Sequence, residues 1–209
     1  METYELKASD GCFDDFYSLL VAIASLATAA QWHTSGTVDF KPGETIALEC
    51  NHLSDREVHL PLFGPVESAL AGVPPKIIQI SVKQRNPAPP GYTTQTSGFA
   101  RAVETIFQPF FVNFYERYSD EIAAKYGVID KEAPSAWQMG WVVRNAVSHN
   151  GCVGFKNKNH LPVTWQGLTL SPADEGKALF HSTFSAGDLI VMMFEMEEVR
   201  TGKTIDKAI

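Results

Sequence analysis

The sequence predicts a mainly α-helical protein, in which a bundle of four helices carries one irregular insertion and one β-hairpin. Three observations predict this class. Four segments of the 209-residue chain repeat apolar residues at helical spacing. Residues 34–96 instead contain repeated Gly and Pro and no persistent helical period. The apolar and charged fractions are those of a folded domain, so we expect a single unit, residues 1–209, with the insertion at about 34–96.

The first helix is expected to run from Asp10, its capping residue, to about Gln31. Asp14 and Asp15 stand in its first turns, where negative charge is favoured by the helix dipole. The apolar residues that recur at helical spacing are Phe13, Phe16, Leu20, Ile23 and Ala27.

The insertion is expected to hold strands or extended loop rather than long helices. Residues 45–49 alternate between apolar and polar side chains, as a strand does, whereas 65–71 fit a short helix and 76–83 fit either state. Residues 86–91 are rich in Pro and predict an extended connector. We therefore expect a loop- and strand-rich addition after the first helix.

Two more helices follow the insertion. The second is expected from Ser97, its cap, to about Tyr126, with a broad apolar surface rich in phenylalanine. The third begins at Pro134, because proline suits the first turn of a helix, and ends at Asn150-Gly151, where a left-handed backbone is readily adopted. These two helices should form the centre of the bundle.

The C-terminal part is expected to form the hairpin and the last helix. Residues 162–170 and 177–184 predict the two strands, which turn at 171–176 beside the end of the third helix. Ser185 and an acidic residue three positions later resemble a capping box, and the last helix ends near Gly202. The expected order is helix, insertion, helix, helix, hairpin, helix.

Composition excludes several classes of function. A formal net charge of −7 argues against a general nucleic-acid-coating surface, so we expect no DNA binding and only local contact with RNA. No P-loop or dinucleotide glycine motif is present, so no cofactor is expected. Cys50, His52 and His59 are too sparse for a zinc site, so no metal is expected either. Three widely spaced cysteines, without a signal peptide or membrane-spanning stretch, predict a cytoplasmic protein.

The third helix carries the candidate site in its last turns. Trp141, Asn145 and His149 recur every four residues on the side turned from the apolar stripe, with Ser148 beside them and Arg144 on the flank. The Asn-Gly stop places His149 near the negative end of the helix dipole, which favours protonated imidazole. This arrangement suits phosphate binding and proton transfer.

The run Arg144-Asn145-x-x-x-His149, followed by Asn-Gly, resembles the motif of the HEPN superfamily, in which His follows Arg after four to six residues and a polar residue often directly follows the Arg. The resemblance covers mainly the stretch from about residue 97 to the C-terminus. It implies a HEPN-like up-and-down helical bundle, a homodimer, and in many members a metal-independent endoribonuclease site where two protomers meet. Trp137 and Trp141 would then pack across the two-fold axis.

RNA cleavage by internal transesterification requires a base for the 2′-hydroxyl, neutralisation of charge on the phosphorane and a proton for the leaving 5′-oxygen. His149 is the candidate base, Arg144 neutralises charge, and Asn145 orients the imidazole or donates to phosphate. A second protomer's His149 would supply the acid. The candidate substrate-binding residues are Ser148, Lys156 and Lys158.

Two functions remain open on the sequence. The first is a HEPN-type endoribonuclease that forms 2′,3′-cyclic phosphate ends, acts on RNA as a homodimer, and serves as a toxin or defence effector with an antitoxin or regulatory protein as partner. The second is a non-catalytic module of the same fold that dimerises or binds a ligand or partner protein. Convergence of Arg144 and His149 from both chains at a solvent-reachable cleft would favour the first.

Overall fold

The computed structural model describes residues 2–85, 98–155, 157–203 and 207–208 and shows a mixture of helix and sheet. Helix accounts for 49% and strand for 19%, so the expectation of a mainly α-helical bundle is wrong. The difference lies in the insertion, which supplies three strands of a five-stranded sheet of order β2-β3-β4-β1-β7. The first strand of the chain was not expected at all.

The sheet is antiparallel and has one buried face. Its strands are β1 (Glu2–Lys7), β2 (Thr45–Glu49), β3 (Arg56–Pro61), β4 (Ile77–Gln84) and β7 (Lys207–Ala208). The register places Tyr4 opposite Ile80 and Val58 opposite Val82, so alternate residues point to the same side. The buried residues on that side are Tyr4, Leu6, Val58, Leu60, Ile78, Ile80 and Val82.

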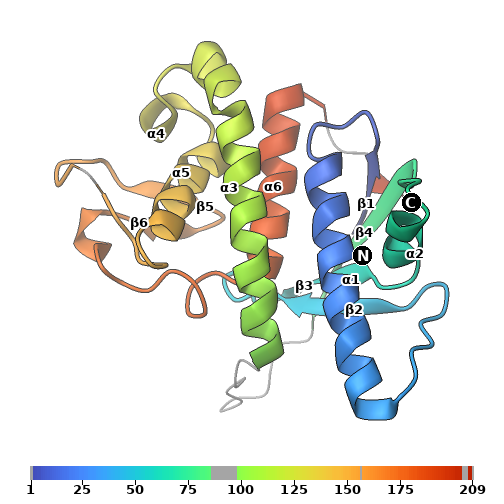
Figure 1. Cartoon of the computed structure of the whole chain (residues 1–209). Coiled ribbons are helices and arrows are strands. Elements are labelled where there is room, and N and C mark those ends of the chain that lie inside the picture. Colours follow the sequence, from blue (N-terminus) through green and yellow to red (C-terminus); the bar gives the residue numbers. More distant parts are fainter. Residues whose placement is uncertain (1, 86–97, 156, 204–206, 209) are drawn as a thin grey trace.

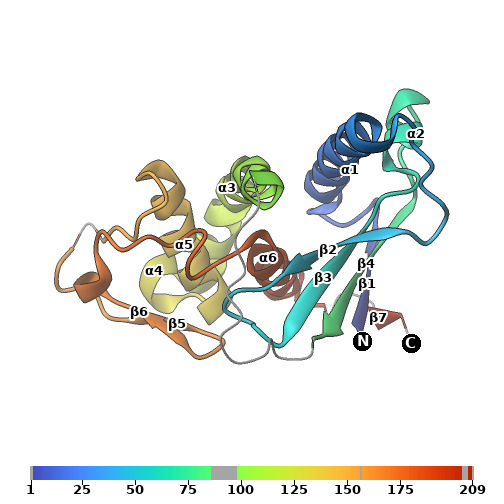
Figure 2. The same cartoon turned by 90° about the horizontal axis from the view of Figure 1, so that it is seen from below.

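Two helices, α1 and α6, pack against this face, and α3 and α5 pack against those helices and each other (Figure 1). The helices are α1 (Phe13–Ser35), α2 (Pro65–Leu70), α3 (Gly98–Tyr126), α4 (Ile129–Glu132), α5 (Ser135–Ser148) and α6 (Ala186–Thr201). Figure 2 shows α6 between the sheet and the pair α3 and α5, with α1 over the sheet. Because α6 is enclosed by neighbours, most of its residues are buried all round.

The ring of Phe194 on α6 joins the two layers into one core. It stacks on Tyr4 of β1 with ring centroids 4.3 Å apart and on Phe16 of α1 with centroids 5.0 Å apart. α1 is also long and apolar enough, by length and composition, to cross a membrane. In this fold Phe16, Leu20 and Ile23 are buried, so α1 serves as a core helix.

The capping residues predicted from the sequence match some of the observed helix ends but not others. Ser185 opens α6 with the expected capping box, and Gly202 closes it with φ of 67°. α1 begins at Phe13 rather than at Asp10, because the Asp10 carboxylate instead accepts a hydrogen bond from the backbone N–H of Lys7, 2.7 Å away. Ser97, the expected cap of α3, lies outside the described residues.

The hairpin before α6 is present but shorter and earlier than expected. It consists of β5 (Val163–Trp165) and β6 (Leu168–Leu170), joined by Gln166 and Gly167, whose φ values are 46° and 83°. Two positive φ values in a two-residue loop match the twist of antiparallel strands. The expected turn contains the short helix η1 (Pro172–Asp174) instead, and no long second strand follows it within the described residues.

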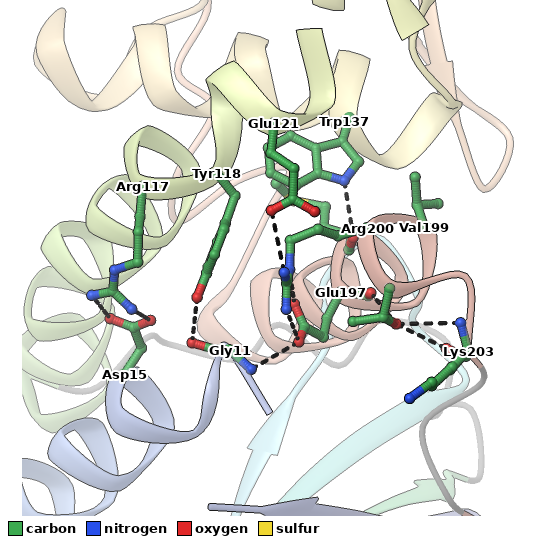
Figure 3. A network of polar contacts seen from close by, with 12 residues as sticks. Gly11, Asp15, Arg117, Tyr118, Glu121, Trp137, Glu197, Val199, Arg200 and Lys203 are labelled. Carbon is green, nitrogen blue, oxygen red and sulfur yellow. Dashed lines mark hydrogen bonds and ion pairs between the residues drawn. The ribbon is translucent and has the colours of Figure 1, made fainter. Parts of the chain in front are cut away.

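A buried polar junction ties α1, α3 and α6 together (Figure 3). Glu197 of α6 is 2% exposed and accepts hydrogen bonds from the Gly11 backbone N–H at 3.0 Å and from Arg200 at 2.8 Å. The Tyr118 hydroxyl donates to the Gly11 carbonyl at 3.0 Å. A Cβ at Gly11 would lie 2.5 Å from both Arg200 Nη2 and the Tyr118 hydroxyl, so any larger residue would have to displace the ends of these two side chains. We call this set the Glu197 junction.

Asp188 ties the turn between β2 and β3 to the start of α6. Its fully buried carboxylate accepts hydrogen bonds from the backbone N–H groups of Asn51 at 2.8 Å and Leu53 at 2.9 Å. It also accepts from the N–H and the hydroxyl of Ser185, each at 2.9 Å. The capping box therefore holds the sheet as well as the helix.

Candidate functional site

The candidate site lies at the C-terminal end of α5. The buried face of this helix includes Ala136, Met139 and Val143, which hold it against the rest of the core. His149 follows the last helical residue, and Asn150 and Gly151 then take φ values of 56° and 78°. The Gly151 N–H donates to the Ala146 carbonyl at 2.8 Å and closes the helix. His149 is therefore exposed at a fixed helix end, as the sequence predicts.

A short antiparallel pairing places a second segment beside this helix end. Cys152 forms a bridge with Ala178, and the Val153 N–H donates to the Lys177 carbonyl at 2.9 Å. The Gly176 N–H returns a bond to the Val153 carbonyl at 2.8 Å. These bonds fix residues 175–179 against 151–153, so the loop after η1 becomes one wall of a cavity.

The cavity has a volume of about 450 Å³. The residues that line it are Asn145, His149, Cys152, Val153, Gly154, Phe155, Glu175 and Gly176. The His149 ring lies directly over Gly154, since a Cβ there would be 3.3 Å from the imidazole Cδ2. Glycine at this position lets the ring lie close to the main chain.

Asn145 and Arg144 form a linked pair. Arg144 Nη1 donates to Asn145 Oδ1 at 3.3 Å, while Arg144 Nε pairs with the Glu116 carboxylate on α3. Since a guanidinium only donates, the amide oxygen must face Arg144. Asn145 is 4% exposed, and its Nδ2 has no hydrogen-bond partner among the residues that the structure describes. A buried donor without an acceptor is costly, and an incoming acceptor would relieve that cost.

The three predicted catalytic residues are thus divided between two environments. Asn145 and His149 line the cavity together. Arg144 is not among the lining residues and reaches the site through Asn145. The structure therefore brings the amide and the imidazole together and gives the guanidinium an ion pair with Glu116.

The predicted substrate-binding residues do not line the cavity where the structure describes them. Ser148 is exposed, and its hydroxyl donates to the Arg144 carbonyl of the preceding turn at 3.4 Å. Lys158 is exposed in the turn after Phe155. Lys156 lies outside the described residues. Neither Ser148 nor Lys158 lines the cavity.

The two tryptophans predicted at a dimer interface pack inside the protomer. Trp137 is fully buried, and its indole N–H donates to the Met196 carbonyl at 2.9 Å, so the expectation that it contacts a second protomer is wrong. Trp141 is half-buried and stacks on His160 with centroids 5.1 Å apart, with Phe155 also beside it. Helical spacing placed Trp141 on the face turned from the apolar stripe and Trp137 on its flank, but α6 covers Trp137, and Phe155 and His160 pack against Trp141.

A second titratable pair lies at the neighbouring end of α3. His181, which has φ of 63°, pairs through Nδ1 with the buried carboxylate of Glu104. Burial raises the pKa of Glu104 to about 7, with the nearby Asp188 adding to the effect. Burial and the charge of Arg101 lower the pKa of His181. Neither residue stands out in the sequence, because they are 77 positions apart and share no local pattern.

Gly154, Phe155 and Glu175 also line the cavity, although the sequence does not mark them as site residues. The available signal was the segment 171–176, which was expected to turn beside the site. Across the described part of the chain, no cluster of three or more His, Cys, Asp or Glu is arranged to hold a metal ion. Comparison of the chain with protein-family models, curated proteins and solved structures finds no match.

Proposed function

We propose that the protein is a metal-independent endoribonuclease whose active site is the cavity at the end of α5. One observation carries the proposal. His149 and Asn145 line the same cavity, and the buried Nδ2 of Asn145 has no hydrogen-bond partner in the described structure. A proton-transfer group beside an unused donor suits a reacting phosphate, which needs both.

Asn145 is the proposed phosphate ligand. Arg144 fixes the amide oxygen, so the amide nitrogen is oriented before substrate arrives. Arg144 uses Nε for Glu116 and one N–H of Nη1 for Asn145, which leaves further N–H groups for a phosphate oxygen. Its proposed roles are to position Asn145 and to neutralise charge at the edge of the site.

His149 is the proposed proton-transfer residue. Its position after the last turn of α5 places the imidazole near the free carbonyls of the helix end, where a cation is favoured. Attack of the 2′-oxygen on phosphorus, with departure of the 5′-oxygen, would yield a 2′,3′-cyclic phosphate and a 5′-hydroxyl. A homodimer that brings two such helix ends together would supply a second His149, using exposed surface rather than Trp137.

The acidic chain is compatible with RNA cleavage only through local contact, as a net charge of −7 repels a polyanion at long range. We propose a cytoplasmic location, where RNA substrates occur. An active ribonuclease there requires control, so an antitoxin-like or other regulatory partner belongs to the same proposal.

One observation favours a second function, a non-catalytic module that binds an anionic ligand. Glu116 already neutralises Arg144, and the pair is half-exposed, as in a structural ion pair. On this alternative the amide of Asn145 would hold a phosphate or carboxylate without cleavage. The same experiment separates the two functions.

The test is incubation of labelled RNA with purified protein in excess chelator. Wild type should cleave and leave 2′,3′-cyclic phosphate ends, and His149→Ala should lose at least about 10²-fold in kcat. His33→Ala is the matched control, because His33 is another exposed histidine in the last turn of a helix. Absence of cleavage by wild type, together with RNA binding that Asn145→Ala weakens, would support the binding module instead.

A further inference from the structure

The cavity holds a second acid-base group that the motif does not contain. Glu175 lines it together with His149 and Asn145. The Glu175 side chain is exposed and makes no hydrogen bond or ion pair with any residue in the described ranges. The neighbouring carboxylate of Asp174 is already used, since Ser171 and Lys177 donate to it. Glu175 is therefore chemically available.

The main chain holds Glu175 in place although its side chain is free. The Glu175 N–H donates to the Pro172 carbonyl at 3.3 Å, and the next N–H, of Gly176, donates to Val153 at 2.8 Å. The main chain of this segment is thus hydrogen-bonded to η1 on its N-terminal side and to Val153 on its C-terminal side. A side chain on such a segment stays at the cavity that His149 also lines and keeps its freedom to reach substrate.

We propose that Glu175 is the general base of this site and His149 its general acid, both supplied by one protomer. The inference rests on the proposed ribonuclease function. The Glu175 carboxylate takes the proton of the 2′-hydroxyl as the bond from the 2′-oxygen to phosphorus forms. The bond from phosphorus to the 5′-oxygen breaks, and the His149 imidazolium donates its proton to that oxygen. Proton exchange with water then restores both groups.

The surroundings of the two groups assign the roles in this direction. The Glu175 carboxylate is exposed, unpaired within the described ranges and lines the cavity, so its oxygens are free to accept a proton from substrate. The His149 ring is held over Gly154 at the end of α5 and lines the same cavity, so it can deliver a proton to the leaving oxygen. Cys152 is the one other titratable side chain among the described lining residues, Arg144 acts through Asn145, and Lys177 is bonded to Asp174. This scheme removes the need for a second protomer's histidine.

Glu175→Gln tests the base, with Asp120→Asn as the matched control that removes one negative charge from the exposed side of α3. We expect Glu175→Gln to lower kcat by about 10²-fold, to leave KM for RNA unchanged or lower, and to abolish the acidic limb of the pH profile. Asp120→Asn should retain wild-type kcat. A wild type that does not cleave overturns the proposed function itself. A wild type that cleaves through His149, with Glu175→Gln equally fast or faster, overturns only the role of Glu175 and shows that it merely repels RNA.

Mixed oligomers test whether one protomer suffices. His149→Ala and Glu175→Gln chains carrying different tags are co-expressed, and the species that holds both tags is purified. Each protomer then lacks one of the two groups, so a site built within one protomer predicts no activity. Recovery of cleavage would show that the groups come from different protomers and would overturn the scheme. If no mixed species forms because the protein is monomeric, wild-type activity itself supports the single-protomer site.

Discussion

Replacement of Glu197 by alanine should lower the free energy of unfolding by about 3 kcal/mol. Glu197 is 2% exposed and accepts hydrogen bonds from Gly11 and Arg200 in the Glu197 junction (Figure 3). Without it the Gly11 N–H loses its acceptor, which costs about 1–3 kcal/mol. Arg200 also loses its buried partner, and removing one member of a buried ion pair costs about 3–5 kcal/mol when the remaining charge has no other partner. Arg200 keeps Glu121 at 3.3 Å, so the total stays near the lower end.

Urea unfolding at neutral pH measures this loss, and a thermal scan should show a Tm lower by about 6–12 °C for a chain of this size. Glu121→Ala is the matched control. It removes only the exposed partner of Arg200, and exposed ion pairs contribute about 0–1 kcal/mol. Glu197→Ala and Glu121→Ala variants of equal stability would refute the reasoning that burial sets the contribution of this junction.

Three further predictions concern the sheet contact, the titratable pair and the cavity. Asp188→Ala should lower the unfolding free energy by about 3–5 kcal/mol in urea titrations, because several buried donors lose one acceptor; a loss below about 1 kcal/mol would contradict this. Burial raises the pKa of Glu104 from 4.5 to about 7, so the folded state binds a proton that the unfolded chain has released, and stability falls as pH rises from about 4.5 to 7. The difference in unfolding free energy between Glu104→Gln and wild type should therefore shift in favour of the variant by up to about 3 kcal/mol between pH 5 and pH 8. The same difference at both pH values would contradict this prediction. Gly154→Ala should displace the His149 ring, whose Cδ2 lies 3.3 Å from the added Cβ, and lower kcat about tenfold with little change in Tm; full activity would mean that the ring position is unimportant.

The sheet shows where local patterns were insufficient. In β3 and β4 buried residues alternate with less buried ones, but the repeated Gly and Pro around these strands predict an irregular insertion. β1 is not evident from the sequence, because these six residues become a strand only through pairing with β4, whose partner residues lie 70 to 80 positions away. Which distant segments pair cannot be predicted from the hydrophobic periodicity of one segment alone.

The sequence by itself determined the helices and the content of the motif. The capping box at Ser185 and the left-handed stop after His149 are set by hydrogen bonds between residues a few positions apart, so they can be read from neighbouring residues. The same local geometry places Asn145 and His149 on one side of α5. The tertiary structure alone decided that Trp137 enters the core and that Glu175 joins the cavity. Those outcomes depend on packing and main-chain bonds between segments far apart in the chain, which form only when the whole core assembles.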